Sequence, residues 1–241
     1  MPDAAARTVV IERLPPGHTV AAEHGEAPIG PASNSRFRSV LGLAEAGGRN
    51  RKPKSPSKAQ LDRKLAFFPL TDLGNAERFV ARFQGRFLWC QPIGWFAWDG
   101  RRWTTDGAEG LVLKAEHETA RGIQDEAAAI RDTDRDVPVS AGKKPGDTEM
   151  LSTKLAAWGR TSESASRLSV IAKRAAPYME VKPTEFDADP MRINVLNGTL
   201  TVTRHERGSR INLSPHDPTD RITKLAPVTF DPAATCALFD V

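Results

Sequence analysis

The stretch TDLGNAERFVARFQGRFLWCQPIGWFAWDGRRW, residues 71–103, decides the fold and holds four of the five Trp. In its first half, apolar residues recur at helical spacing, which predicts a helix with Asn75 as its N-cap. The same spacing places Arg78 and Arg82 on the other side of this helix. Gly85 stands where a helix commonly ends in the left-handed conformation, so we expect the helix to end there.

The second half of this stretch predicts three short strands. Apolar and aromatic residues at 87–89 and 95–98 are separated by a turn, and a third strand begins at Arg102. Asp99-Gly100 is a strong hairpin signal between the second and third strands. A sheet this small does not fold alone, so the segments on either side must cover it.

The rest of the chain adds helices and then more strands. Helical periodicity predicts a long helix over 109–131, a shorter one over 149–158, and another that is capped by Thr161 or Ser162. From residue 186 onward, short β-like runs alternate with Asn-Gly and Arg-Gly turns. We therefore predict an α+β fold, in which a small antiparallel aromatic meander packs with several helices and a short-stranded β region follows.

Composition divides the chain into three parts. Residues 17–57 are rich in Gly, Pro, Ala and Ser, and they bury too little apolar surface to offset the entropy lost on ordering. We expect a disordered basic tail or linker over 1–59, a helix-plus-meander domain over 60–185 and a short β-rich segment over 186–241. Within the second part, residues 132–148 are expected to form a charged loop.

Positive charge is concentrated in the first part of the chain. Residues 1–106 carry 16 Lys and Arg against 10 Asp and Glu, whereas residues 107–241 carry 18 against 20. A polyanion would therefore meet the N-terminal part first. The basic run at 49–58 is typical of a segment that contacts nucleic acid, and it would equally serve as a solubilising linker.

Aromatic faces beside Arg side chains can stack single-stranded bases and hold phosphates. The aromatic turn of the meander has this composition, although the same aromatic residues would also fill a core beneath the sheet. The candidate nucleic-acid-binding residues, from the basic run and from this turn, are Arg49, Arg51, Lys52, Lys54, Lys58, Trp98, Arg101 and Arg102.

The sequence contains fragments of motifs for catalysis and metal binding, and none of these is complete. Gly142-Lys143 lacks the first Gly and the hydroxyl of a phosphate-binding loop. The acidic run at 132–136 lacks the Gly and the closing carboxylate of a calcium loop. His117-Glu118 has Arg121 where a zinc protease needs its second His. We therefore predict no catalytic residue, no metal ligand and no cofactor.

Cysteine usage and hydropathy point to the cellular compartment. Cys90 and Cys236 lie far apart and have no redox or metal spacing. The N-terminus has no apolar segment of the kind that export needs, and no run is long enough to span a membrane. We therefore expect a cytoplasmic protein without a membrane partner.

Several phrases occur in an order that resembles a known family. They are TDLGNAERFVARF followed by GWFAWDGRRW within 71–103, SESASRLSVIAKRA at 162–175, FDADPMRINVLNGTLTV at 186–202, and SPHDPTDRITKLAPVTFDPAATC at 214–236. In this order they resemble the domain that precedes the superfamily 3 helicase in phage, plasmid and poxvirus-type DNA primase–helicases. The resemblance covers about residues 61–241.

The resemblance implies a non-catalytic pre-helicase module that acts in DNA replication of a mobile element. Such a module would link, assemble or load the helicase and contact single-stranded or forked DNA. Its implied partners are this DNA, a helicase domain or a separately encoded helicase, and further copies of the chain. A protein–protein assembly module without DNA contact is the alternative.

The resemblance also implies a truncated chain. The sequence contains neither the primase nor the ATPase domain of the complete relatives, and it stops in an apolar segment where those relatives begin the ATPase. ATP and Mg²⁺ are therefore expected only for the missing helicase domain, and no catalytic residue is carried over to this sequence.

Overall fold

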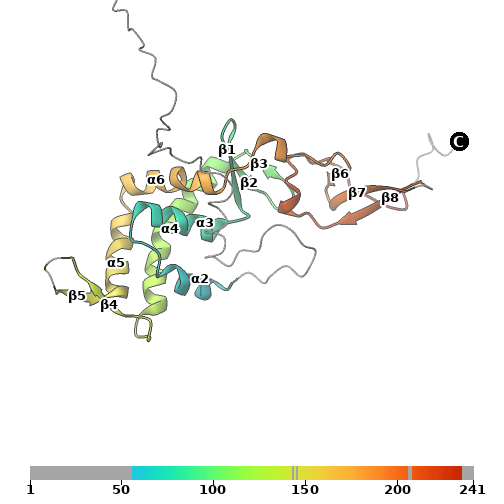
Figure 1. Cartoon of the computed structure of the whole chain (residues 1–241). Helices are drawn as coiled ribbons and strands as arrows, with labels where there is room; N and C mark the ends of the chain where they lie inside the picture. Colours follow the sequence, from blue (N-terminus) through green and yellow to red (C-terminus); the bar gives the residue numbers. More distant parts are fainter. Residues whose placement is uncertain (1–55, 143, 145, 206–207, 235–241) are drawn as a thin grey trace, which may run out of the picture. The chain divides into compact units, whose positions relative to one another are not determined.

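The computed structural model describes residues 56–142, 144, 146–205 and 208–234, all of which belong to one unit (Figure 1). These residues form helices and three small antiparallel sheets, joined by loops and turns, which confirms the predicted α+β class. The predicted disordered tail lies outside the described residues except for its last few positions. The division of the remainder at residue 185 stays a prediction.

The aromatic meander forms as predicted, and both of its faces are covered. On one face Trp95 contacts Phe79, with ring centroids 6.2 Å apart. On the other face Phe96 stacks on Phe186 at 4.5 Å. Gly85, with φ of 77°, separates the meander from the preceding helix in the expected left-handed conformation. The strands, in antiparallel order, are β1 Phe87–Cys90, β2 Gly94–Trp98 and β3 Trp103–Thr104.

Helix α3, Asp72–Phe83, begins earlier than predicted. Its N-cap is Thr71, whose hydroxyl accepts a hydrogen bond from a backbone N–H of the first turn. The predicted N-cap at Asn75 is therefore wrong. The Asn75 side chain is buried, donates to Ser162 Oγ and accepts from Trp158 Nε1, both at 3.0 Å. A capping residue one turn earlier and these two buried partners together outweigh the local preference of Asn for a cap.

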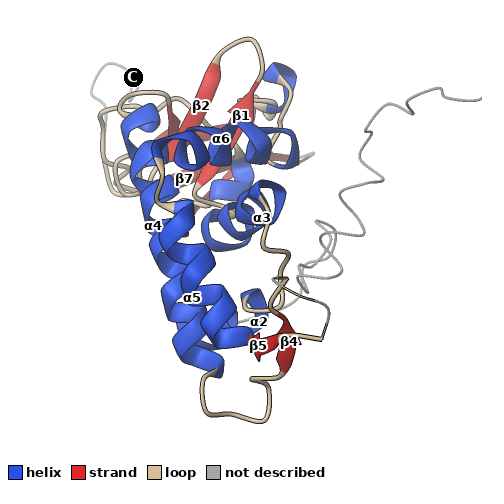
Figure 2. Cartoon of the chain, turned by 90° about the vertical axis from the view of Figure 1, so that its left-hand side faces the viewer, coloured by secondary structure: helices blue, strands red, loops and turns tan. Residues whose placement is uncertain are grey.

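Helix α4, Ala108–Ile130, confirms the predicted long helix and contacts four other helices and strand β2. Figure 2 shows α4 and α5 side by side, and Ile123, Ile130 and Leu155 are fully buried in the core between them. None of the helices described is long and apolar enough to cross a membrane. The other α-helices are α2 Lys58–Leu65, α5 Leu151–Ser162 and α6 Ala165–Ala175.

Two local expectations between α4 and α6 were wrong. The expected loop at 132–148 contains the start of a hairpin of β4, Pro138–Ser140, and β5, Thr148–Met150. Its strands are short and mostly exposed, so they lack the apolar alternation that sequence analysis detects. Helix α5 continues to Ser162, and the N-cap of α6 is Ser164 instead of Thr161 or Ser162.

The predicted β region forms a third sheet. At the β6 edge of this sheet, the side-chain amide of Asn197 binds the backbone of Phe230. Its Nδ2 donates to the carbonyl of Phe230 and its Oδ1 accepts from the N–H of Phe230, both at 3.0 Å. Residues 226–230 therefore run beside this edge, while the outer edge of β8 pairs with no described strand. The strands, in antiparallel order, are β6 Arg192–Val195, β7 Gly198–His205 and β8 Gly208–Ser214.

A buried ion network joins α2, α3 and α4. Arg78 and Glu126 are both fully buried, and Arg78 Nε donates to Glu126 Oε2 at 2.8 Å. Arg82 bridges Glu126 Oε1 and Asp62 Oδ1, each at 2.8 Å. Burial raises the pKa of Glu126, while the Arg78 and Arg82 guanidinium groups oppose that rise. The remaining donors of Arg78 bind the backbone carbonyls of Leu65, Phe68 and Pro69.

A second buried carboxyl group connects α4 with α6. Glu116 is only 6% exposed, and its Oε1 accepts a hydrogen bond from the N–H of Ala172 at 3.0 Å. Burial raises the pKa of Glu116, and the hydrogen bond and nearby His117 and Lys173 act against this rise. Because folding favours its protonated form, Glu116 stabilises the fold most at acidic pH.

We expect Glu116→Gln to raise the melting temperature at pH 7–8 and to have little effect near pH 4. The folded pKa lies above the unfolded value of about 4.3, so wild-type stability from this group is lost as pH rises through the folded pKa. The Gln oxygen still accepts from Ala172 but carries no charge. The measurement is thermal unfolding from pH 4 to 8, with Glu118→Gln, exposed on the same helix, as the matched control. A difference that is constant across pH would contradict the assignment.

Candidate nucleic-acid interface

The turn at 99–102, between β2 and β3, is held by its own acidic residue. Asp99 Oδ1 accepts hydrogen bonds from the N–H groups of Arg101 and Arg102, at 2.7 and 2.8 Å. Burial acts to raise the pKa of Asp99, but these amides and the Arg102 guanidinium hold it below its usual value. Gly100 takes φ of 98°, which only Gly adopts without strain. The turn therefore presents its side chains from a fixed backbone.

The three candidate residues of this turn have different environments. The Arg101 side chain is exposed and has no hydrogen-bond or ion-pair partner among the described residues. Arg102 is half-buried, with Nε 3.6 Å from Asp99 Oδ2 and a terminal nitrogen 3.5 Å from the Thr223 carbonyl. Trp98 is half-buried against Trp103, with ring centroids 5.6 Å apart. Arg101 is thus the most available for a phosphate, and the Trp98 ring is largely occupied by packing.

The structure describes the last three residues, 56–58, of the basic run. Lys58 is the first residue of α2, and its ammonium group lies 2.7 Å from Asp125 Oδ2 and 3.0 Å from Asp62 Oδ2. Hydrogen bonds to these two carboxylates raise the pKa of Lys58. A phosphate bound there would have to replace both contacts. The other four candidates, Arg49, Arg51, Lys52 and Lys54, lie outside the residues described, and their role stays a prediction.

The third sheet is joined to the meander at this turn. Asn194 Nδ2 donates to the carbonyl of Arg101 at 2.8 Å, and Thr199 Oγ1 donates to Asn194 Oδ1 at 2.7 Å. The N–H of Trp103 donates to the Ile222 carbonyl at 2.9 Å. Asn194 of β6 and Thr199 of β7 therefore connect the third sheet to the backbone of Arg101.

Sequence analysis missed basic residues on this sheet. Arg192, at its base, forms ion pairs with Asp189 and Asp220. Farther along, Arg204 and Arg210 are exposed, and no ion pair or hydrogen bond of their side chains occurs in the described part of the chain. The segment TVTRHERGSR, 201–210, could have indicated them. The net charge of residues 107–241 as a whole is slightly negative, and this average conceals the local excess of Arg in 201–210.

Two hollows border this sheet, and the lining of one of them includes the apolar residues Ile193, Ile222 and Leu225. The other, of about 330 Å³, is lined by residues that include Arg192, Thr201 and His216. Both ring nitrogens of His216 are buried, and neither has a hydrogen-bond partner among the described residues. In the parts of the chain that the structure describes, no group of three or more His, Cys, Asp or Glu is placed to hold a metal ion.

Comparison with protein families agrees with the order of phrases in the sequence. A family model described as "D5 N terminal like" matches residues 76–240, more than half of the chain. This is the N-terminal domain of D5-like primase–helicases, so the match places the protein in DNA replication by that class. The chain therefore belongs to the D5 N terminal like family, which confirms the resemblance. A comparison with curated proteins found no match.

Proposed function

We propose that this chain is the non-catalytic pre-helicase module of a phage- or plasmid-type DNA primase–helicase. It links, assembles or loads the helicase, and it contacts single-stranded or forked DNA. Family membership supports the replication role. In this proposal ATP and Mg²⁺ are bound by the helicase domain, and the assembly is cytoplasmic.

One observation carries the DNA contact. The Arg101 side chain is exposed and has no partner in the described part of the chain, and it extends from a turn whose backbone is fixed by Asp99. A guanidinium group presents parallel N–H donors that match two phosphate oxygens. Because the turn is already ordered, binding a phosphate there requires little further loss of backbone entropy. Arg102 lies beside it and can exchange its weak contacts for a second phosphate.

We expect Arg101→Ala combined with Arg102→Ala to weaken binding of single-stranded and forked DNA. Each lost phosphate contact lowers the slope of log affinity against log salt by about 0.7 for single strands, so two contacts lower it by about 1.4. The measurement is fluorescence anisotropy with labelled DNA between roughly 50 and 200 mM salt. Thermal unfolding should change little, because the Arg102–Asp99 pair is substantially exposed.

The matched control for this pair is Arg131→Ala with Arg135→Ala, which removes two exposed Arg side chains near the C-terminal end of α4. This control should leave the salt slope close to that of the wild type. An affinity of the wild type that is the same at both salt concentrations would count against the DNA contact.

A second candidate function is protein–protein assembly without DNA contact. The register of the third sheet aligns Ile193, Leu200 and Leu213 on one face, and Ile193 and Leu213 are 48% and 37% exposed. Val202 and Ile211 extend the same face, and Ile211 is 51% exposed. Contiguous exposed apolar surface commonly marks an interface. Light scattering at tens of micromolar tests self-assembly, and a monomer with and without DNA would exclude it.

A further inference from the structure

The third sheet continues as a bare two-stranded ribbon. Strand β6 pairs with β7 only over Gly198 to Thr201, whereas β8 pairs with β7 as far as His205. Beyond the Arg192–Thr201 pair, no third strand among the described residues therefore pairs with β7 or β8 (Figure 1). The described side chains beyond Val202 are exposed. A two-stranded hairpin gains little stability by itself, so an exposed one is suited to contact another molecule.

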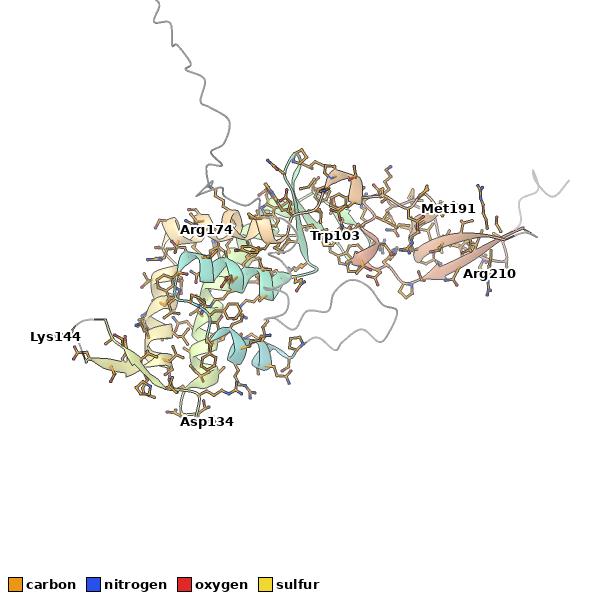
Figure 3. All side chains as sticks on the ribbon, in the orientation of Figure 1. Trp103, Asp134, Lys144, Arg174, Met191 and Arg210 are labelled. Carbon is orange, nitrogen blue, oxygen red and sulfur yellow. The ribbon has the colours of Figure 1, made fainter. Side chains whose placement is uncertain are left out.

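The ribbon sequence carries an excess of positive charge. Residues 196–214 contain Arg204, Arg207 and Arg210 against one acidic residue, Glu206. Within 56–142, 144, 146–205 and 208–234, no acidic side chain pairs with Arg204 or Arg210. Figure 3 shows the Arg210 side chain on the ribbon. Arg210 lies opposite Thr203, and Arg204 points to the other face, so both sides of the ribbon carry a guanidinium group.

One face of the ribbon carries a row of hydrogen-bonding side chains. Thr201 and Thr203 lie on this face of β7, and their partners on β8 are Asn212 and Arg210. Hydroxyl, amide and guanidinium groups make most protein contacts to DNA phosphates and sugars. Residues 196–214 contain no Phe, Trp or Tyr. The ribbon therefore has no aromatic ring on which a single-stranded base could stack. Its hydroxyl, amide and guanidinium groups suit the phosphates and sugars of a duplex better than the bases of a single strand.

We propose that the β7–β8 ribbon binds duplex DNA by entering the major groove, with Arg204 and Arg210 contacting phosphates on its two sides. The major groove of B-form DNA, about 12 Å wide, admits a two-stranded β-ribbon. The groove of A-form RNA is too deep and narrow for one. This inference rests on the proposed function and deepens it, because a replication fork offers both a duplex arm for the ribbon and a single-stranded arm for Arg101.

The test uses the full chain and three labelled probes of equal length: duplex DNA, single-stranded DNA and duplex RNA. Arg204→Ala with Arg210→Ala should lower the salt slope for duplex DNA by about 1.8, since each phosphate contact contributes about 0.9. The slope for single-stranded DNA should not change, and duplex RNA should bind more weakly than duplex DNA. Arg204→Lys with Arg210→Lys should retain the slope. Arg131→Ala with Arg135→Ala again serves as the control for net charge.

The outcomes separate this inference from the proposed function. A ribbon variant with the wild-type slope on duplex DNA overturns the inference, while a loss of single-strand binding in the Arg101 and Arg102 variant still supports the proposed contact. Conversely, ribbon-dependent duplex binding with no affinity for single strands supports the inference and refutes that contact. Equal losses on all three probes would show unspecific attraction and overturn the duplex assignment. A wild type that binds none of the probes overturns both.

Discussion

Arg78→Leu is expected to lower the free energy of unfolding by about 3–5 kcal/mol, the usual result of removing one partner of a buried ion pair. Arg78 has no exposed surface, and it binds Glu126 and three backbone carbonyls between residues 65 and 69. Leu would remove one hydrogen-bond donor from each of those carbonyls and leave Glu126 with Arg82 alone. The loss should therefore affect the packing of α2, α3 and α4 together.

Denaturant unfolding followed by circular dichroism measures this change. Arg63→Leu is the matched control, because Arg63 is exposed on α2 and only donates to the carbonyl of Ala59. Arg78→Leu combined with Glu126→Leu should recover part of the loss, since it removes the buried charge that the single variant leaves poorly compensated. A single variant within 1 kcal/mol of the wild type would show that the network contributes little.

Trp103→Ala should also lower the free energy of unfolding by about 3–5 kcal/mol, the range for large aromatic residues in a core. Trp103 is 2% exposed, packs in a cluster with Cys90, Phe96 and Val181, and its Nε1 donates to the carbonyl of Pro218 at 2.8 Å. The cavity would remove both apolar contacts and this hydrogen bond. Because the bond joins the meander to the segment after β8, that segment should also loosen.

Two companion variants separate these effects, again by denaturant unfolding. Trp103→Phe loses the hydrogen bond to Pro218 but keeps an aromatic ring and most of the packing. Its free energy of unfolding should therefore fall less than that of Trp103→Ala. Trp98→Ala should cost less than Trp103→Ala, because Trp98 is only half-buried. If Trp98→Ala proves the more damaging of the two Ala variants, the core of the meander has been assigned to the wrong Trp.

Local signals predicted the elements of this fold well. Asp99-Gly100 and the aromatic alternation identified the meander, and helical periodicity identified α4. The Asn75 cap was wrong because Thr71 offers similar capping chemistry one turn earlier. Local spacing placed Arg78 opposite the apolar residues of its helix, but the partner that buries it, Glu126, lies 48 residues away in sequence. Such long-range pairing leaves no periodic pattern in the sequence.

The candidate site was predicted less completely than the fold. The sequence identified Arg101 and Arg102 because they lie beside the aromatic residues of the meander. It could not show that Asp99 fixes their backbone or that Asn194 brings the third sheet to the carbonyl of Arg101. Arg204 and Arg210 were missed because their significance depends on strand register, which places them beyond the end of β6.

The distribution of tryptophan determines which events intrinsic fluorescence can report. Trp89, Trp95, Trp98 and Trp103 lie in the meander, and Trp158 on α5 is covered by the guanidinium of Arg167, 4.3 Å above its ring. Their emission follows the loss of the helical and aromatic core. Residues 196–214 contain no Trp, so binding or unfolding confined to the ribbon would not change the tryptophan emission. A Trp introduced at the exposed Ser209 would give that region its own signal.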